Sequence, residues 1–436
     1  MADRNVVLIT ADSVRADHCT SSNDTWDTTP NLDRSIDDGV VFESAIAPGP
    51  RTLSSVPVSH TGEPFALNGL DMSVYQNRVD KIRTHLSTHD TIAERFRQAG
   101  YATLGFTTNP WTSRNTGFER GFDRFEEFED NADGLLRQVS SDTRFDTPTK
   151  FIDQWINNKV WFTQWPDYYD EILSAMESVD EPYFLWVFLL DTHNPYFPTS
   201  DDRIESSTLR MYYSMLRGNS AFNQTGGMST HRGSLSPGVK AGIERAYRDS
   251  VRSVDRFVGT LWRDLRETDP VFAFHSDHGE AFGDHGTYGH QPVVYEENIR
   301  VPFVVFNVED SERVRRPVSL EVIPEVLSAY ANGEGIAPER WAAEYVFSRT
   351  EDGRTIALRG EEWKYIRSGG SEELYQLAED PGEREDRSGR GEGKLAELRG
   401  VLDRYLDSLP RVDVREGASA NDSTVKDRLD SLGYIG

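Results

Sequence analysis

Cysteine and long apolar runs are almost absent from this chain. Cys19 is the single cysteine among 436 residues, so an internal disulfide framework and a cysteine metal cluster are both excluded. No apolar run approaches the roughly 20 residues of a membrane-spanning helix, and the segment from Met1 to Thr10 enters a strand pattern with no signal peptide. We therefore expect a cytoplasmic protein with no membrane span.

Lysine is also scarce, whereas acidic residues are abundant. Asp and Glu number 73 against 47 Lys and Arg, which gives a net charge of −26, and only seven of the 47 are lysine. Carboxylates hold water and cations at a surface, and salt screens their mutual repulsion. The composition thus indicates a halophilic protein that does not bind nucleic acid. An ordinary acidic cytosolic protein is the alternative, but the acidic residues are spread along the chain rather than gathered in one tail.

Short apolar runs alternate with amphipathic segments over most of the chain. The strand-like runs cover residues 5–10, 40–46, 102–107, 183–190, 271–274 and 301–306. Helical periodicity is expected over residues 29–38, 89–99, 168–179, 239–267 and 320–331. This alternation predicts an α/β fold, with a mostly parallel sheet flanked by helices. The Ser-, Asn-, Gly- and Arg-rich stretch 199–237 is expected to be an irregular surface excursion.

The pattern changes near residue 333 to closely spaced short strands. These are expected over residues 344–349, 355–359, 363–367 and 374–377, followed by a helix over 394–408. We predict a catalytic α/β domain over residues 1–333, an antiparallel C-terminal subdomain with a helix over 334–409, and a linker with a terminal short helix (425–432) over 410–436.

Reactive residues follow two of the strand-like runs. Asp277 and His278 come directly after the run that starts at Val271, and Asp12 follows the first run. Ligands of open α/β sheets lie beyond the carboxyl ends of the strands, so these side chains are expected at one rim. Two carboxylates and an imidazole suit one divalent metal ion: oxygen donors fit Mg, Mn or Ca, and the nitrogen favours Mn or Zn.

The segment PGPRTLSSVPVSHTG opens with prolines and a glycine, and a helix is expected to start within it at Thr52. A hydroxyl at a helix N-terminus faces unpaired backbone N–H groups, which also stabilise an incoming anionic ester. Thr52 is therefore the candidate nucleophile, and its oxygen is a further candidate metal ligand. Arg51 could pair with an ester oxygen, or form an ion pair at the surface.

Several motifs in this order resemble the sulfatase family within the alkaline phosphatase superfamily. They are NVVLITADSVRADH, TTPNLDRSIDDGVVFESAIAP, HSDHGE, YGHQPVVYEENIRVPFVVF and EEWKYIRSGGSEELYQLAEDPGERED. The resemblance covers nearly the whole chain. It implies an alkaline-phosphatase-like fold, a divalent metal ion and hydrolysis of a sulfate or phosphate ester.

The chain departs from that family's pattern at three positions. Formylglycine-type sulfatases carry Cys or Ser where Thr52 stands, and threonine cannot become formylglycine. Val56 replaces the motif's Arg, and Ser13 replaces a second metal-binding Asp. The set instead resembles superfamily members with a threonine nucleophile, such as lipoteichoic acid synthase and nucleotide pyrophosphatases, which act on phosphodiesters.

The resemblance also implies roles for two histidines. His193, in DTHNPY, matches the family's substrate-contacting histidine, and His290 lies where the family has a basic residue that reaches the ester oxygens. Both are catalytic candidates, whereas Asn109 matches no family residue. A second metal ion held by Asp191, His193 and His290 is a minority hypothesis. Asp284 and His285 are candidates for orienting the metal ligands.

We therefore predict a metal-dependent sulfatase-family hydrolase that uses Thr52 to form a covalent intermediate. A phosphodiesterase or phosphoglycerol-type transferase of surface-polymer or glycan metabolism is one alternative. A non-catalytic metal-binding family member is another. The expected partner is a small-molecule, glycan or lipid ester, and the sequence does not set the oligomeric state.

Overall fold

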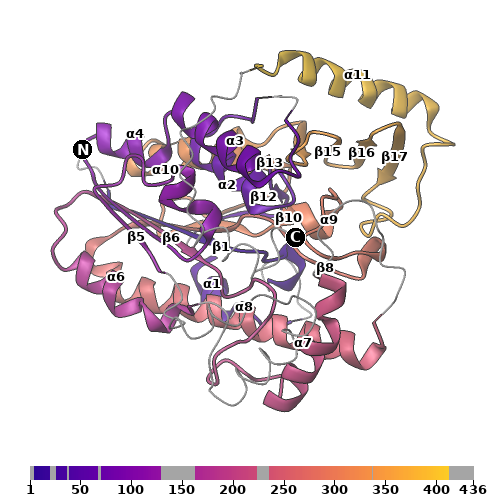
Figure 1. The fold of residues 1–436 in the computed structure, drawn as a ribbon. Helices are drawn as coiled ribbons and strands as arrows, with labels where there is room; N and C mark the ends of the chain where they lie inside the picture. Colours follow the sequence, from indigo (N-terminus) through magenta and orange to yellow (C-terminus); the bar gives the residue numbers. More distant parts are fainter. Residues whose placement is uncertain are drawn as a thin grey trace.

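The computed structural model describes residues 4–19, 26–36, 39–66, 70–128, 163–222, 235–335 and 337–411. Its centre is an eight-stranded sheet with the order β12-β2-β11-β7-β1-β6-β4-β5 (Figure 1). The strands are β1 (Val6–Ala11), β2 (Gly39–Phe42), β4 (Ala102–Thr107), β5 (Arg124–Glu127), β6 (Tyr183–Leu189), β7 (Val271–Ser276), β11 (Phe303–Phe306) and β12 (Glu312–Val314). Only β11 runs against its two neighbours, so the predicted mostly parallel α/β fold is confirmed.

Helices cover both faces of this sheet, which explains why its central strands are apolar throughout. In β1, Val6 and Leu8 pack toward one helical layer, while Val7 and Ile9 pack toward the other. The first layer holds α2 (Thr52–Thr61), α3 (Tyr75–Thr88), α4 (Ile92–Gln98) and α10 (Ile323–Ala331). The second holds α1 (Pro30–Ile36), α6 (Tyr169–Met176) and α8 (Pro237–Leu265) (Figure 1).

Two sequence predictions about strands are corrected. Residues 40–46 are not one strand, because a turn at Glu43 and Ser44 separates β2 from β3 (Ala45–Ile46). The run 301–306 is likewise divided at Pro302 into β10 (Arg300–Val301) and β11. Strand β3 pairs with β10 and β13 (Val318–Ser319) in a separate three-stranded sheet. Proline cannot donate to a sheet ladder, so a break at Pro302 is expected.

The stretch predicted to be irregular over 199–237 contains α7 (Thr208–Phe222). Met211 and Met215, four residues apart, are buried against α8 and form the apolar stripe of this helix. The Ser- and Arg-rich composition concealed that stripe. Helix α3 was also missed, although Val79, Ile82 and Leu86 share its buried face.

The C-terminal sheet consists of β14 (Tyr345–Arg349), β15 (Thr355–Gly360), β16 (Trp363–Ser368) and β17 (Ser371–Gln376), each antiparallel to the next. One face packs on Leu398 and Leu402 of α11 (Glu392–Ser408). The other packs on Ile46 and Ile299 of the main unit, by which we mean the part of the chain that contains the eight-stranded sheet. The four predicted strands and the helix are confirmed. The proposed boundary at 333 remains a prediction, and the helix predicted over 425–432 lies outside the described residues.

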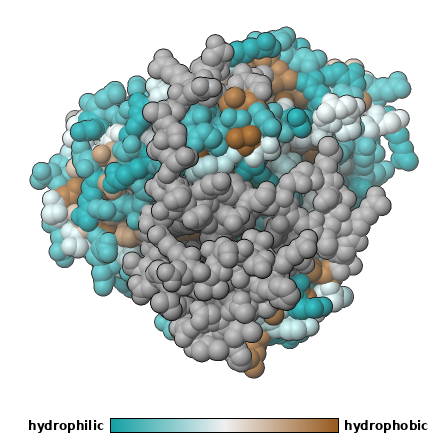
Figure 2. Space-filling view, viewed as in Figure 1, coloured by the Kyte–Doolittle hydropathy of each residue, from teal (hydrophilic) through white to brown (hydrophobic). Residues whose placement is uncertain are grey.

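Hydrophilic residues predominate among the coloured atoms in Figure 2, in line with the net charge of −26. Across the part of the chain that the structure describes, no helix combines the length and apolarity needed to cross a membrane.

Candidate active site

The carboxyl ends of β1 and β7 bring three polar residues together. The two strands are parallel neighbours with Ala11 opposite Ser276, so the next residues, Asp12 and Asp277, also lie opposite each other. The Asp277 N–H donates to the Ala11 carbonyl at 3.1 Å, which continues the pairing by one residue. His278 follows directly. The register between β1 and β7 is therefore sufficient to bring Asp12 next to Asp277.

One ligand atom from each of Asp12, Asp277 and His278 lies within 4.8 Å of the others. The His278 Nε2 atom is 3.8 Å from Asp12 Oδ1 and 3.6 Å from Asp277 Oδ2, and all three side chains are buried. His278 Nδ1 lies 2.9 Å from the Gly279 carbonyl oxygen, which can only accept a hydrogen bond. Nδ1 therefore carries the proton, and the Nε2 lone pair faces the carboxylates, as in histidines that bind metals.

The two carboxyl groups respond differently to burial. Burial, and then the charge of Asp12, raise the pKa of Asp277 well above its ordinary value. Burial also opposes ionisation of Asp12, but the imidazoles of His193, His278 and His290 lower its pKa. Asp277 forms no ion pair with a lysine or arginine among the residues described. Two oxygen donors and one nitrogen donor at this spacing fit a divalent cation.

Thr52 is the first residue of α2, and its side chain is buried. Its Oγ1 lies 3.4 Å from Asp12 Oδ2 and 3.4 Å from His278 Nε2. The hydroxyl therefore joins the cluster from a different part of the chain. Helix α2 begins at Thr52 and ends before a left-handed Gly62, so the N-terminus of the helix lies at the cluster.

Two further side chains hold the Asp12 carboxylate. Asn109, which follows β4, donates through Nδ2 to Asp12 Oδ2 at 2.9 Å and lies 3.5 Å from Thr52 Oγ1. The Ser13 hydroxyl donates to Asp12 Oδ1 at 2.5 Å, and the Ser13 N–H donates to Asp277 at 3.2 Å. The family resemblance left Asn109 without a role. Its place after a strand that ends at the same rim was the available signal.

The imidazole of His290 lies close to those of both His193 and His278. Ring centroids are 5.2 Å apart for His193 and His290, and 5.0 Å apart for His290 and His278. Burial, then His278 and His193, lower the pKa of His290 well below its ordinary value. The structure thus places both catalytic candidates beside the cluster, whereas their roles remain predictions.

Glu280 was not predicted as a site residue, although it ends the HSDHGE motif. Its Oε1 lies 3.4 Å from His290 Nδ1, and its Oε2 accepts a 2.7 Å hydrogen bond from the Tyr196 hydroxyl. Burial raises the pKa of Glu280 to about 7. An acidic residue two positions after a metal-ligand candidate was the signal that could have identified it.

The second-metal hypothesis and the orienting role of Asp284 and His285 remain predictions. The Asp191 carboxylate accepts from the Trp165 N–H at 3.2 Å, and the described part of the chain gathers only one metal-type group, at Asp12. The His285 ring contacts Glu297 and the Glu383 carbonyl instead of the metal-ligand candidates.

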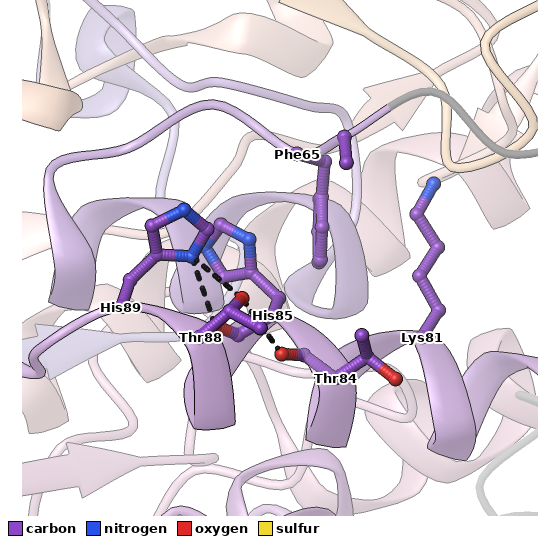
Figure 3. Close-up of a pocket in the computed structure, with 7 residues that line it drawn as sticks. Phe65, Lys81, Thr84, His85, Thr88 and His89 are labelled. Atoms are coloured by element: carbon purple, nitrogen blue, oxygen red, sulfur yellow. Dashed lines mark hydrogen bonds between the residues drawn. The ribbon is translucent and has the colours of Figure 1, made fainter. Parts of the chain in front are cut away.

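A small pocket elsewhere, drawn in Figure 3, is separate from this cluster. It borders α3, and the residues that line it are Phe65, Ala66, Lys81, Thr84, His85, Thr88 and His89. None of the predicted site residues is among them.

Comparison with known proteins identifies the family of this chain. A family model described as Sulfatase matches residues 4–330. The chain belongs to the sulfatase family. An arylsulfatase of Clostridium perfringens is 25% identical over 340 residues, which span 70% of this chain and 68% of the relative.

Solved structures related to this sulfatase-family chain share its fold. A 2-O GAG sulfatase superimposes with a TM-score of 0.65 at 16% identity, over 93% of this chain and 92% of the other. A phosphonate monoester hydrolase of Agrobacterium radiobacter superimposes with a TM-score of 0.62 at 20% identity, over 93% and 95%. The predicted alkaline-phosphatase-like fold is therefore confirmed.

Proposed function

We propose that this protein is a metal-dependent hydrolase of sulfate or phosphate esters in which Thr52 is the nucleophile. The observation that carries the proposal is the position of the Thr52 hydroxyl, 3.4 Å from both Asp12 and His278 at the start of α2. Family membership supports ester hydrolysis as the reaction class.

The proposed metal ligands are Asp12, Asp277, His278 and the Thr52 oxygen. The divalent ion would lower the pKa of the Thr52 hydroxyl and polarise a nonbridging ester oxygen. Mn or Zn is favoured because His278 adds a nitrogen to the oxygen donors.

The chain's own residues prepare the nucleophile. The Thr52 hydroxyl donates toward Asp12 Oδ2, so this carboxylate is positioned to accept the proton when the hydroxyl attacks. Asn109 donates to the same oxygen and fixes its orientation. The Thr52 oxygen then forms a bond to sulfur or phosphorus while the bond to the alcohol oxygen breaks. Backbone N–H groups at the start of α2 favour the anionic group that is being transferred.

His193 and His290 serve the leaving group in this proposal. His193 donates a proton to the departing alcohol oxygen, which would otherwise leave as an alkoxide. His290, at 5.2 Å from His193 between ring centroids, stabilises the charge on the transferred group. Water then cleaves the Thr52 ester, which restores the hydroxyl and releases sulfate or phosphate from a monoester, or the monoester or phosphonate from a diester or phosphonate substrate.

The nucleophile favours phosphorus esters alongside sulfate esters. Position 56, where formylglycine motifs carry Arg, is a fully buried valine of the core. Thr52 also cannot be converted to formylglycine. Phosphodiesters and phosphonate monoesters are therefore candidate substrates, and a transferase that passes the group to an alcohol instead of water uses the same first step.

The test compares ester classes in one preparation. Protein purified in molar salt is assayed with an aryl sulfate, an aryl phosphate, a diaryl phosphate and an aryl phosphonate, each with Mn, Mg, Zn or Ca. We expect turnover of at least one class that depends on an added cation and disappears in Thr52→Ala. Tight cation binding with no turnover of any ester would favour the non-catalytic alternative. Faster product formation with an added alcohol would favour transfer.

A further inference from the structure

The turn between β14 and β15 of the C-terminal sheet lies against the segment that leads to Thr52. The Arg349 N–H, at the end of β14, donates to the Pro48 carbonyl at 2.9 Å. Next to it, a Cβ on Gly49 would lie 2.7 Å from the Arg349 carbonyl oxygen and 2.3 Å from Ser54 Oγ. Only glycine permits this approach, so the two segments are closely packed.

Lys81 of α3 fixes the same turn from another side. It extends past Phe65, with Nζ 4.8 Å from the centre of that ring (Figure 3). Nζ donates to the Glu351 carbonyl oxygen at 2.6 Å. The backbone of Glu351 is therefore held by the main unit.

The Glu351 side chain reaches into the active-site region. It is 6% exposed, and its Oε1 accepts from Arg51 Nη1 at 3.0 Å. Arg51 Nε donates to the carbonyl oxygen of His290 at 2.9 Å. A continuous chain of contacts thus runs from the C-terminal sheet through Arg51 to the backbone of His290.

Arginine is suited to such a connection because its planar guanidinium donates in fixed directions from several nitrogens. Arg51 uses two of them on partners that are distant in sequence, and it directly precedes Thr52. Turning the guanidinium would therefore disturb both the nucleophile and the His290 segment. Glu351 prevents this by a charge-assisted hydrogen bond in a buried environment.

We propose that Arg51 and Glu351 are positioning residues for the reaction: Glu351 fixes Arg51, and Arg51 fixes the relative placement of Thr52 and His290. This inference rests on the proposed function. It assigns part of the active site to the C-terminal sheet, through a contact between residues 300 positions apart.

The test uses a matched pair of Glu→Gln substitutions. Glu351→Gln weakens the contact with Arg51. Glu373→Gln weakens another contact of the C-terminal sheet with the main unit, the 3.0 Å hydrogen bond from the Tyr295 hydroxyl. We expect Glu351→Gln to lower kcat by about tenfold or more, with a smaller change in KM, because the reacting groups are misplaced. Glu373→Gln should stay within about twofold of the wild type. Equal losses in both variants would overturn the proposal.

A double-mutant cycle separates positioning from general docking. In a His290→Ala background, Glu351→Gln should cost less than it does in the wild type, since one of the two groups that it positions is gone while Thr52 remains. An undiminished loss would overturn the proposal. The imidazole resonances of His290 supply a readout besides activity, and they should shift in Glu351→Gln but not in Glu373→Gln. Unshifted resonances would contradict the proposal even if the His290→Ala background is inactive.

Arg51→Lys provides a second route if Glu351→Gln does not fold. Lysine keeps the charge but cannot serve both partners in the fixed geometry of a guanidinium, so a similar fall in kcat is expected. Wild-type kcat in Arg51→Lys would contradict positioning. The proposed function fails separately, if the wild type hydrolyses no ester or if Thr52→Ala remains active.

Discussion

Two groups of buried charges in this molecule are arranged in opposite ways. At the rim of the eight-stranded sheet, Asp12 and Asp277 face each other with His278, and no lysine or arginine pairs with Asp277 within the described chain. Under the C-terminal sheet, Lys364 lies 3.0 Å from Glu296 and 2.7 Å from Glu383, fully buried between them.

The pKa of Glu296 shows the effect of the nearby lysine. Burial opposes ionisation of Glu296, but Lys364 and then Arg359 lower its pKa to about 2, whereas burial raises the pKa of Glu383 to about 7 beside the same lysine. Burial and the neighbouring Asp12 instead raise the pKa of Asp277. The group under the C-terminal sheet contains basic partners, Lys364 and Arg359, whereas Asp277 pairs with no lysine or arginine among the residues described. Buried charges are tolerated when they are paired. The lysine between Glu296 and Glu383 is therefore expected to stabilise the fold, whereas the carboxylates at the rim are expected to bind a ligand.

The largest expected effect is on catalysis at the rim. Thr52→Ala should reduce kcat by about 10⁴-fold or more, as loss of a nucleophile does in other covalent mechanisms, while cation binding by the remaining ligands persists. Steady-state kinetics and cation titration on the same preparation measure both quantities. Wild-type turnover in this variant would remove Thr52 from the mechanism.

The next effect is on stability at the interface. Lys364→Met leaves Glu383 buried without its lysine and Glu296 with Arg359 alone, and it should lower the free energy of unfolding by about 3 kcal/mol. Denaturant melts measure the change. Lys394→Met is the control, because Lys394 pairs with Glu397 at the surface of α11 and should cost about 0.5 kcal/mol or less. Equal effects in the two variants would contradict the comparison.

A smaller effect is expected on cation affinity. Asp277→Asn removes one charged ligand and should weaken binding of Mn or Zn by about a hundredfold, at a cost near 2.7 kcal/mol. The cation-free variant should be no less stable than the wild type, because a buried repulsion is relieved. Calorimetric titration and thermal melts measure the two outcomes. Unchanged affinity would show that Asp277 is not a ligand.

The smallest effect concerns pH. Because the pKa of Asp277 is higher in the folded than in the unfolded state, the cation-free folded protein holds more protons above about pH 4. Asp277 therefore contributes stability at low pH that is lost as the pH rises, by up to about 1.4 kcal/mol per pH unit. The difference between wild type and Asp277→Asn isolates this contribution. A saturating cation should abolish it, and a difference of opposite sign would contradict the assignment.

Much of the central sheet could be predicted because β1, β6 and β7 are buried on both faces and read as continuous apolar runs. The approach of Asp12 to Asp277 also follows from strand order, since both residues end parallel strands. These features depend on local pattern and on general rules of α/β sheets.

The remaining contacts depend on how distant segments pack. Arg51 meets Glu351 only because the turn after β14 lies on the Pro48 segment, and no local pattern encodes that contact. Asn109 reaches Asp12 through the shared rim, which the sequence places only approximately. Helix α7 was hidden because its buried stripe is narrow and its composition is polar.

The central claim is that the Thr52 oxygen carries the transferred group. The most direct measurement is peptide mass spectrometry of an acid-quenched reaction with a substrate ester and a divalent cation. The account predicts one sulfuryl or phosphoryl group on the peptide that contains Thr52, present in wild type and absent in Thr52→Ala. Steady turnover with the group on another residue, and none on that peptide, would contradict it.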